Sequence, residues 1–134
     1  YCRLAFYTVF LYSSLFRSQS GTFDVQSEVG LALFRIAQES LQNAIKHADA
    51  DSIVVRLARV GSILELSVPD DGVGFDEARC ATDAAGGRGL ASLRERARLV
   101  GAALEVRSTP GEGTTILVRV ACEDSQRPRT LVRR

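Results

Sequence analysis

The sequence predicts an α/β protein, a two-layer sandwich in which helices pack on one face of a mixed, mostly antiparallel sheet. Two segments, Glu28 to Ala48 and Leu90 to Val100, repeat apolar residues at the three- and four-residue spacing of a helix. Two pairs of short alternating segments are each joined by a glycine-containing turn, which is the pattern of β-hairpins. The 134 residues fit one domain with a hydrophobic core of its own.

The first helix is predicted to be amphipathic. Ser27 is a favourable capping residue, and Glu28 places a negative charge in the first turn, where it suits the helix dipole. The apolar face comprises Val29, Leu33, Ile36, Ala37, Leu41, Ala44, Ile45 and Ala48. The polar face comprises Arg35, Gln38, Glu39, Gln42, Asn43 and Lys46. The second helix is expected to end at Gly101, since glycine is favoured just after a helix C-terminus.

The two hairpins are expected on either side of a long loop. The first comprises residues 53–57 and 64–68, and the second comprises residues 104–107 and 115–120. The loop between the first hairpin and the second helix is rich in Gly, Asp and Ala. It begins at Pro69, which has no backbone N–H to donate, so the strand ending there is expected to lie at a sheet edge or to bend.

Both ends of the chain are expected to lie outside the domain, which we place at residues 22–122. Residues 1–21 form a lead-in to which we assign no role, and residues 123–134 form a basic tail that is expected to be disordered. Within the lead-in, the apolar stretch from Leu4 to Phe16 is shorter than the about 20 residues that span a bilayer. It is a packed helix or strand, or the remnant of a membrane segment. Because the chain begins with Tyr1 rather than Met, we expect further sequence upstream.

The composition is that of an ordinary soluble globular protein, 46% hydrophobic and 25% charged. A formal net charge of +1 gives no general attraction to nucleic acid or anionic membrane, so no nucleic-acid partner is expected. The three cysteines, Cys2, Cys80 and Cys122, form no C-x-x-C pair and have no histidine at metal-ligand spacing. They indicate a reduced, cytoplasmic setting without a zinc site.

Three glycine-bearing loops are candidates for ligand binding. In the D-D-G-V-G run at residues 70–74, glycines let the backbone approach a flat ligand, and a carboxylate can accept a hydrogen bond from an amino group. The G-R-G-L run at residues 87–90 opens a helix, whose free N–H groups attract anions. The G-E-G-T run at residues 111–114 lies in the second hairpin. Taken singly, each run is also compatible with an ordinary turn.

One polar face of the first helix is a candidate metal site. Glu39, Asn43 and Lys46 lie at i, i+4 and i+7, so they are expected within about 60° of one another around the helix axis. A carboxylate, an amide oxygen and an ammonium group aligned in this way suit a hydrated Mg²⁺ with phosphates beyond it. The alternative is a solvated helix face.

The order of these four features resembles one ATPase superfamily. E-x-x-x-N on a helix, D-x-G-x-G after a hairpin, G-x-G-L opening a helix and G-x-G-T in the last hairpin resemble the N box and the three glycine boxes of that superfamily. It includes histidine kinases, DNA gyrase, the Hsp90 chaperones and the MutL repair proteins. The resemblance implies the Bergerat form of the α/β sandwich, with ATP and Mg²⁺ as cofactors.

The amino-acid sequence is similar to that of one branch, the two-component sensor histidine kinases that phosphorylate LuxR-type response regulators. The similar segments are "LFRIAQESLQNAIKHADA", "DDGVGFD" and "GRGLASLRERARLVGAALEVRSTPGEGTTILVRV". The resemblance extends from Ser27 to Val120. It implies an ATP-binding catalytic domain in the cytoplasm, cut from a homodimeric parent kinase that is either membrane-anchored or not.

The resemblance also implies a role for each matching residue. Asn43 would bind Mg²⁺, and Glu39 would activate water as in related ATPases, or orient a metal-bound water. Lys46 would face the phosphates, and Asp70 would accept the adenine amino hydrogen. Residues 76–86 would form a mobile lid. The nucleotide-binding residues that it implies are Asn43, His47, Asp70, Gly72, Gly74, Gly87, Arg88, Gly89, Leu90 and Thr114.

The sequence departs from what the branch usually has at Pro69, at Arg88 and in residues 1–19. Arg88 stands where a histidine is frequent, so it either reaches a phosphate or is solvated. The single histidine of the chain, His47, lies inside the ATP-binding helix. The phosphoacceptor histidine and the dimerisation helices are therefore expected on a separate segment.

The predicted function is transfer of the ATP γ-phosphoryl group to a histidine of the dimerisation domain, with a LuxR-type response regulator downstream. One alternative is an anti-sigma-factor kinase that phosphorylates serine on a partner protein. The R-E-R run from Arg94 and the S-T-P-G-E-G-T run favour the sensor-kinase branch over it. The other alternative is a non-catalytic ATP-sensing module, which the presence of Glu39, Asn43 and Asp70 argues against.

Overall fold

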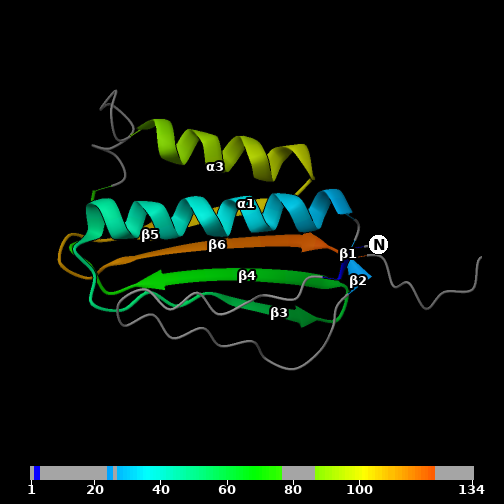
Figure 1. Ribbon diagram of the computed structural model, residues 1–134, viewed down its shortest axis with the longest axis horizontal. Coiled ribbons are helices and arrows are strands. Elements are labelled where there is room, and N and C mark those ends of the chain that lie inside the picture. The colour runs from blue at the N-terminus through cyan, green and yellow to red at the C-terminus, as the bar shows by residue number, and fades with distance from the viewer. Residues whose placement is uncertain (1, 4–23, 26, 77–86, 123–134) are drawn as a thin grey trace, which may run out of the picture.

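The expected two-layer α/β sandwich is confirmed in the computed structural model of the chain (Figure 1). Two long helices lie together on one side of a four-stranded sheet. The apolar lead-in, most of the expected lid and the basic tail lie outside the described part of the chain, so those expectations remain predictions. The described residues are 2–3, 24–25, 27–76 and 87–122.

The sheet has the strand order β3-β4-β6-β5. Its strands are β3 (Arg56–Val60), β4 (Ile63–Asp70), β5 (Ala103–Ser108) and β6 (Thr114–Ala121). Every pairing among the described residues is antiparallel, so the mixed component that we expected is not seen there. The two expected hairpins thus meet through β4 and β6, the strands at the centre of the sheet.

A short separate pair of strands lies near the start of the first helix (Figure 1). In it, β1 (Cys2–Arg3) pairs antiparallel with β2 (Asp24–Val25). The strand β2 ends two residues before the start of the first helix. Backbone pairing with β2 therefore attaches Cys2 and Arg3 to the segment that leads into the first helix.

The helices bury most of the faces that their apolar spacing predicted, but the prediction was wrong for Ile45, which is 64% exposed and lies after the change from α-helix to π-helix. From α1 (Ser27–Asn43) and the turn that follows it, the buried apolar residues are Leu33, Ile36, Ala37 and Ala44. From α3 (Gly87–Leu99), they are Leu90, Leu93 and Ala97. The amide of Gly101 donates to the Arg98 carbonyl, and the amide of Ala102 donates to the Ala97 carbonyl. This bond pair is the Schellman motif, so the expected helix end at Gly101 is confirmed.

The sheet face under the helices is built from cross-strand rows. One row is Leu66, Val118 and Leu104, and the next is Val68, Ile116 and Val106. Because side chains alternate along a strand, residues two positions further on face the helices again. The following row is polar, and it consists of Asp70, Thr114 and Ser108. The core face therefore ends in a row of a carboxyl and two hydroxyl groups.

The first sheet strand begins later than the sequence predicted. Ile53 and Val55 are buried as their alternation implied, but the regular ladder starts at Arg56. Ile53 forms only an isolated bridge to Asp70, and the amide of Val54 donates to the carbonyl oxygen of Pro69 at 3.0 Å. Since that carbonyl faces β3, the missing N–H of Pro69 is on the same side. The regular β3–β4 ladder stops where it would need an N–H donor from Pro69. The strand β4 is nevertheless an interior strand of the sheet and not an edge strand.

The first helix also changes geometry before its expected end. The α-helix stops at Asn43, and η1 (Ala44–Ala48) is a π-helix. Asp49 then adopts the left-handed conformation, with φ 47°. A π-helix bonds each residue to the fifth one along, so side chains after Asn43 do not continue the α-helical register.

Charged pairs occupy the sheet face away from the helices. Arg119 contacts Glu65 at 2.7 Å, and Arg107 contacts Glu105 at 2.6 Å. The hydrogen bond from Arg107 lowers the pKa of the Glu105 carboxyl. These side chains remain largely in contact with solvent, so such pairs stabilise the fold little.

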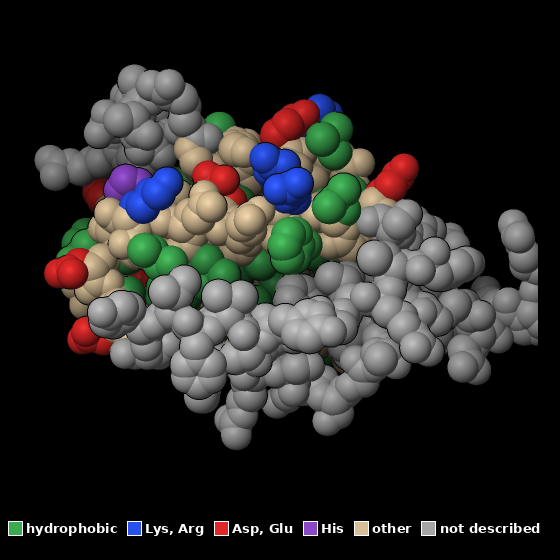
Figure 2. Space-filling model, viewed as in Figure 1, with side chains coloured by type: hydrophobic (Ala, Val, Ile, Leu, Met, Phe, Trp, Pro, Cys, Tyr) green, Lys and Arg blue, Asp and Glu red, His purple; other side chains and the backbone are tan. Residues whose placement is uncertain are grey.

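Some large apolar side chains of the first helical segment are exposed. Leu31, Phe34 and Ile45 are 59%, 44% and 64% exposed. Figure 2 shows hydrophobic and charged side chains interspersed on the face turned to the viewer. In the described part of the chain, no helix is both long enough and apolar enough to cross a membrane.

Candidate functional site

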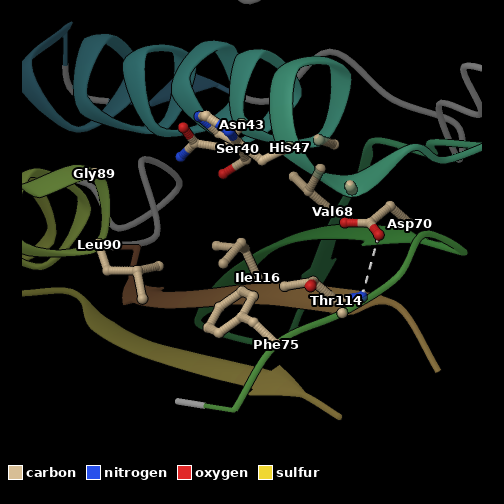
Figure 3. A pocket seen from close by; sticks show the side chains of 13 residues that line it. Ser40, Asn43, His47, Val68, Asp70, Phe75, Gly89, Leu90, Thr114 and Ile116 are labelled. Carbon is tan, nitrogen blue, oxygen red and sulfur yellow. Dashed lines mark hydrogen bonds between the residues drawn. The ribbon is translucent and has the colours of Figure 1, made fainter. Parts of the chain in front are cut away.

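A cavity of about 380 Å³ lies between the helical layer and the polar end of the sheet. Gly89 and Leu90 lie at one end of it, and Asp70 and Thr114 lie at the other (Figure 3). The residues that line it are Ser40, Asn43, Ala44, His47, Ala48, Val68, Asp70, Gly74, Phe75, Gly89, Leu90, Thr114 and Ile116. The cavity therefore has an apolar body with a few polar groups, as is usual for small-molecule sites.

Asp70 is held by backbone donors through one of its two oxygens. Its Oδ1 accepts the amide of Gly72 at 3.0 Å and the amide of Thr114 at 3.2 Å. These bonds fix the rotation of the half-buried carboxylate. Among the described residues, no group donates to Oδ2, so this oxygen is available to a ligand. An ionised carboxylate can only accept, so that end of the cavity selects a donor.

The loop after Asp70 is tied to two other elements. The amide of Val73 donates to the carbonyl of Ala48 at 2.7 Å, and the amide of Gly111 donates to the carbonyl of Val73 at 2.6 Å. One residue of the loop thus bonds the end of the first helical segment on one side and the β5–β6 turn on the other. The loop, the helix end and the hairpin form one connected wall of the site.

Asn43 faces the beginning of α3 across the other end of the cavity. A Cβ atom added at Gly89 would lie 3.3 Å from Nδ2 of Asn43, so the Asn43 side chain and the start of α3 approach each other closely here. The half-buried Asn43 side chain makes no hydrogen bond to any described residue. The first N–H groups of a helix have no partner within the helix, so the start of α3 attracts negative charge. This end therefore suits an anion beside an amide that is free to bind it or its counter-ion.

The side chains around the cavity can bind Mg²⁺ only if most of its ligands are waters or phosphate oxygens. The described residues contain no group of three or more His, Cys, Asp or Glu side chains that could hold a metal ion. Mg²⁺ commonly keeps several waters and takes one or two protein ligands together with substrate phosphates. The amide oxygen of Asn43 fits that role, whereas a metal held mainly by protein side chains does not fit.

Comparison with known families agrees with this geometry. The profile of the family described as "Histidine kinase-, DNA gyrase B-, and HSP90-like ATPase" matches residues 28–124, which include every residue lining the cavity. The chain belongs to this family. The expected resemblance is thereby confirmed, and the domain can be called a histidine-kinase-type ATPase domain.

Curated relatives place this ATPase domain among the sensor histidine kinases. It is 50% identical over 100 residues to an uncharacterized sensor-like histidine kinase of Chloroflexus aurantiacus, covering 72% of the chain and 17% of that protein. It is 42% identical over 90 residues to the sensor histidine kinase LiaS of Bacillus subtilis, covering 66% of the chain and 24% of that protein. The chain therefore spans less than a quarter of the length of these relatives.

Solved histidine kinases have the same fold. The histidine kinase domain of the blue-light activated histidine kinase from Erythrobacter litoralis EL346 is 26% identical with a TM-score of 0.65, over 81% of this chain and 52% of that one. Full-length ShkA has a TM-score of 0.69 at 19% identity, over 85% of this chain and 27% of that one. The second likeness supports the fold alone.

The kinase-type cavity brings most of the predicted site residues together. Gly72 lies just behind the lining, where a Cβ atom would overlap the Ala48 carbonyl oxygen. Gly87 begins α3, and the Arg88 side chain is not described. Those of the predicted residues that line the cavity are Asn43, His47, Asp70, Gly74, Gly89, Leu90 and Thr114. Their individual roles remain predictions.

Glu39 and Lys46 are not among the residues that line this cavity. Glu39 is half-buried and Lys46 is exposed. The alignment with Asn43 that we expected assumed a continuous α-helix, and the π-helical turn changes the register before Lys46 is reached. His47, which the resemblance also implied, does line the cavity. The sequence therefore anticipated the polar face of the helix, but not that Lys46 would lie outside the cavity.

Several lining residues were missed by sequence reasoning. Ser40 is buried, and its hydroxyl donates to the Ile36 carbonyl at 2.8 Å. It could have been found as a serine within the apolar stripe of the first helix. Phe75 could have been found as the aromatic residue that directly follows the glycine loop. The remaining missed residues are Ala44, Ala48, Val68 and Ile116, whose apolar spacing indicated only the core.

Gly74 is expected to be irreplaceable where Gly61 is not, although both have nearly the same backbone conformation. Their φ angles are +61° and +60°. A Cβ atom at Gly74 would overlap the carbonyl oxygen of Thr109, whereas one at Gly61 would meet nothing within 4 Å. We expect Gly61→Ala to lower the free energy of unfolding by about 1 kcal/mol, the cost of a left-handed alanine. Gly74→Ala should cost at least about 1 kcal/mol more, from the overlap.

Urea unfolding of the two variants measures this difference, and calorimetric titration with ATP follows its effect on the site. The Gly74 substitution pushes the loop away from the hairpin, so it should weaken nucleotide binding. The Gly61 substitution, in the β3–β4 turn, should leave binding unchanged. Equal unfolding free energies for the two variants would contradict the close packing of the loop.

Proposed function

We propose that this histidine-kinase-type ATPase domain binds Mg-ATP in the cavity, with the adenine near Asp70 and the phosphates near Asn43. The observation that carries the proposal is the division of one cavity into two chemically different ends. One end offers hydrogen-bond acceptors, and the other lies beside the N-terminus of α3. An adenine nucleotide has an amino group at one extremity and anionic phosphates at the other, so it matches both ends at once.

At the adenine end, Asp70 accepts a hydrogen from the amino group through Oδ2. The apolar side chains of Val68, Phe75 and Ile116 line the cavity between its ends and provide surfaces for a flat ring (Figure 3). Gly74 keeps the loop close to the hairpin, and Thr114 places a hydroxyl beside the same edge of the ring.

At the phosphate end, Asn43 would hold Mg²⁺ through its amide oxygen, and the first amides of α3 donate hydrogen bonds to the phosphate oxygens. When bound, Mg²⁺ neutralises charge on the phosphates during transfer. His47 lines this part of the cavity and can donate to a phosphate. Glu39 orients a water, and Lys46 adds positive charge; neither is among the residues that line the cavity. Phosphoryl transfer needs positioning and charge more than covalent help from the protein.

The acceptor is a histidine on the dimerisation domain of a parent homodimer. One bond breaks between the γ-phosphorus and its bridging oxygen, one forms to a histidine ring nitrogen, and ADP leaves. A LuxR-type response regulator then takes the phosphoryl group from that histidine. The sensor histidine kinases named among the relatives support this assignment. The domain acts in the cytoplasm, as part of a parent kinase that is either membrane-anchored or not.

Incubation with γ-labelled ATP and Mg²⁺ is expected to leave the chain itself unlabelled. Its single histidine, His47, lies within the nucleotide site and is not placed as an acceptor. Addition of the parent kinase's dimerisation fragment should produce acid-labile label on that fragment. The label should disappear when the fragment's acceptor histidine is replaced by glutamine.

The rival functions predict different outcomes of the same experiment. Acid-stable label on a serine of a partner protein would indicate a serine kinase. Nucleotide binding without transfer to the matched fragment would indicate an ATP-sensing module. Acid-labile phosphate on His47 would contradict the proposed division between acceptor and catalytic domain.

A further inference from the structure

Ser108 lies at the end of the polar row without lining the cavity. Its hydroxyl is half-buried and has three partners. The amide of Phe75 donates to Oγ at 2.9 Å, and Oγ donates to the carbonyl of Gly113 at 3.1 Å. The third partner is Oγ1 of Thr114, at 2.8 Å. Both Phe75 and Thr114 line the cavity, so one side chain bonds two residues of the site.

The hydrogen-bonding capacity of a hydroxyl decides the direction of the third bond. A serine hydroxyl has one hydrogen and two lone pairs. In Ser108, the hydrogen goes to the Gly113 carbonyl, and one lone pair accepts the amide of Phe75. All three contacts are satisfied together only if the second lone pair accepts the hydroxyl hydrogen of Thr114.

This direction gives Thr114 a defined polarity toward the cavity. Its hydroxyl hydrogen points to Ser108, so its oxygen can offer only lone pairs to a ligand. Its amide is also fixed, because it donates to Oδ1 of Asp70. Thr114 and Asp70 thus present two acceptors side by side, which suits an amino group carrying two hydrogens.

The same hydroxyl fixes the chain after the glycine loop. Phe75 is half-buried, and its ring points into the cavity (Figure 3). Its backbone amide is bonded to Ser108, a residue 33 positions further along the chain. Without that bond, the backbone at Phe75 would lose its attachment to the β5 strand.

We propose that Ser108 is a positioning residue of the nucleotide site, which fixes the Phe75 backbone and makes Thr114 an acceptor toward the base. This role rests on the proposed nucleotide function. It adds to that function a residue outside the cavity that sets the selectivity for the base. Ser108 acts through Thr114 and Phe75 and does not touch the nucleotide.

The test compares ATP with inosine triphosphate, in which a carbonyl replaces the amino group. For Ser108→Ala, we expect the ratio of ATP to inosine triphosphate affinity to fall about fivefold to tenfold, since the freed Thr114 hydroxyl can donate to that carbonyl. Ser108→Thr keeps the hydroxyl and should restore the ratio to within about twofold of the wild type. Thr114→Val should lower the affinity ratio by a similar factor. Combined with Ser108→Ala it should lower the ratio little further, because both changes remove the same Thr114–Ser108 hydrogen bond.

Amide hydrogen exchange in the nucleotide-free protein tests whether Ser108 anchors the Phe75 backbone. The Phe75 amide should exchange faster in Ser108→Ala than in the wild type. Ser67→Ala, a half-buried serine on the other face of the sheet, should change neither exchange nor the affinity ratio. An unchanged ratio in both Ser108→Ala and Thr114→Val would overturn the proposal, as would unchanged Phe75 exchange. If the wild type bound no ATP, the proposed function would be refuted, while the exchange data would still test the anchor.

Discussion

Replacing Asn43 with alanine is expected to remove magnesium-dependent ATP binding by this ATPase domain. The amide of Asn43 has no partner among the described residues and lies beside the start of α3, where we place the phosphates. A hydrogen bond or ligand contact to a charged group contributes about 1.5–3 kcal/mol. Its loss corresponds to roughly a 10- to 150-fold rise in Kd for Mg-ATP.

The measurement is calorimetric titration with ATP, with Mg²⁺ present and with a chelator. Gln42→Ala is the matched control, because Gln42 is also an amide near the end of α1 but is exposed and outside the cavity. Alanine is a better helix former than either amide, so neither variant should unfold the domain. Equal ATP affinity with and without the metal would refute the assignment of Asn43 as its ligand.

Replacing Asp70 with asparagine is expected to narrow the discrimination between ATP and GTP. Guanine presents a carbonyl oxygen where adenine has its amino group, so with Asp70 two acceptors would face each other. Such an unpaired arrangement costs about 2 kcal/mol or more, and the wild type should prefer ATP by at least that amount.

The backbone around Asp70 determines how the asparagine would be oriented. Oδ1 accepts the amides of Gly72 and Thr114, so the amide oxygen of the asparagine should keep this position. Its NH₂ group would then point into the cavity, since the flipped orientation would set two donors against two donors. The new donor repels the adenine amino group and can bind the guanine carbonyl.

Competition binding of ATP and GTP to the wild type and to Asp70→Asn checks this expectation. ATP affinity should fall and GTP affinity should be maintained or rise. The two retained backbone bonds should keep the free energy of unfolding near that of the wild type. If the wild type bound both nucleotides equally, Asp70 would not read the base. Unchanged ATP affinity in the variant would lead to the same conclusion.

Local sequence signals predicted the elements well where burial alone decides them. The buried faces of α1 and α3 follow the apolar spacing, and the helix end at Gly101 follows from the residue type. The lower reliability at strand ends has a physical cause. Ile53 is buried by alternation, yet the regular β3 ladder begins only at Arg56, because Pro69 on the neighbouring strand has no N–H to donate.

The site was predictable in its motifs but not in its register. The order of the glycine loops and the E-x-x-x-N helix is visible along the chain, and it identified the family. The π-helical turn at residues 44–48 has no local signal that we recognised. It places His47 in the cavity lining and leaves Lys46 exposed outside it.

The sequence by itself determined the family, the sandwich of helices on hairpins, and the residue types available for binding a nucleotide. These depend on local spacing and on the order of motifs, which the chain carries without folding. Only the tertiary structure decided that Asp70, Thr114 and Ser108 form one row. They are brought together by the pairing of β6 with both β4 and β5, and register between strands distant in sequence is set by packing of the whole sheet.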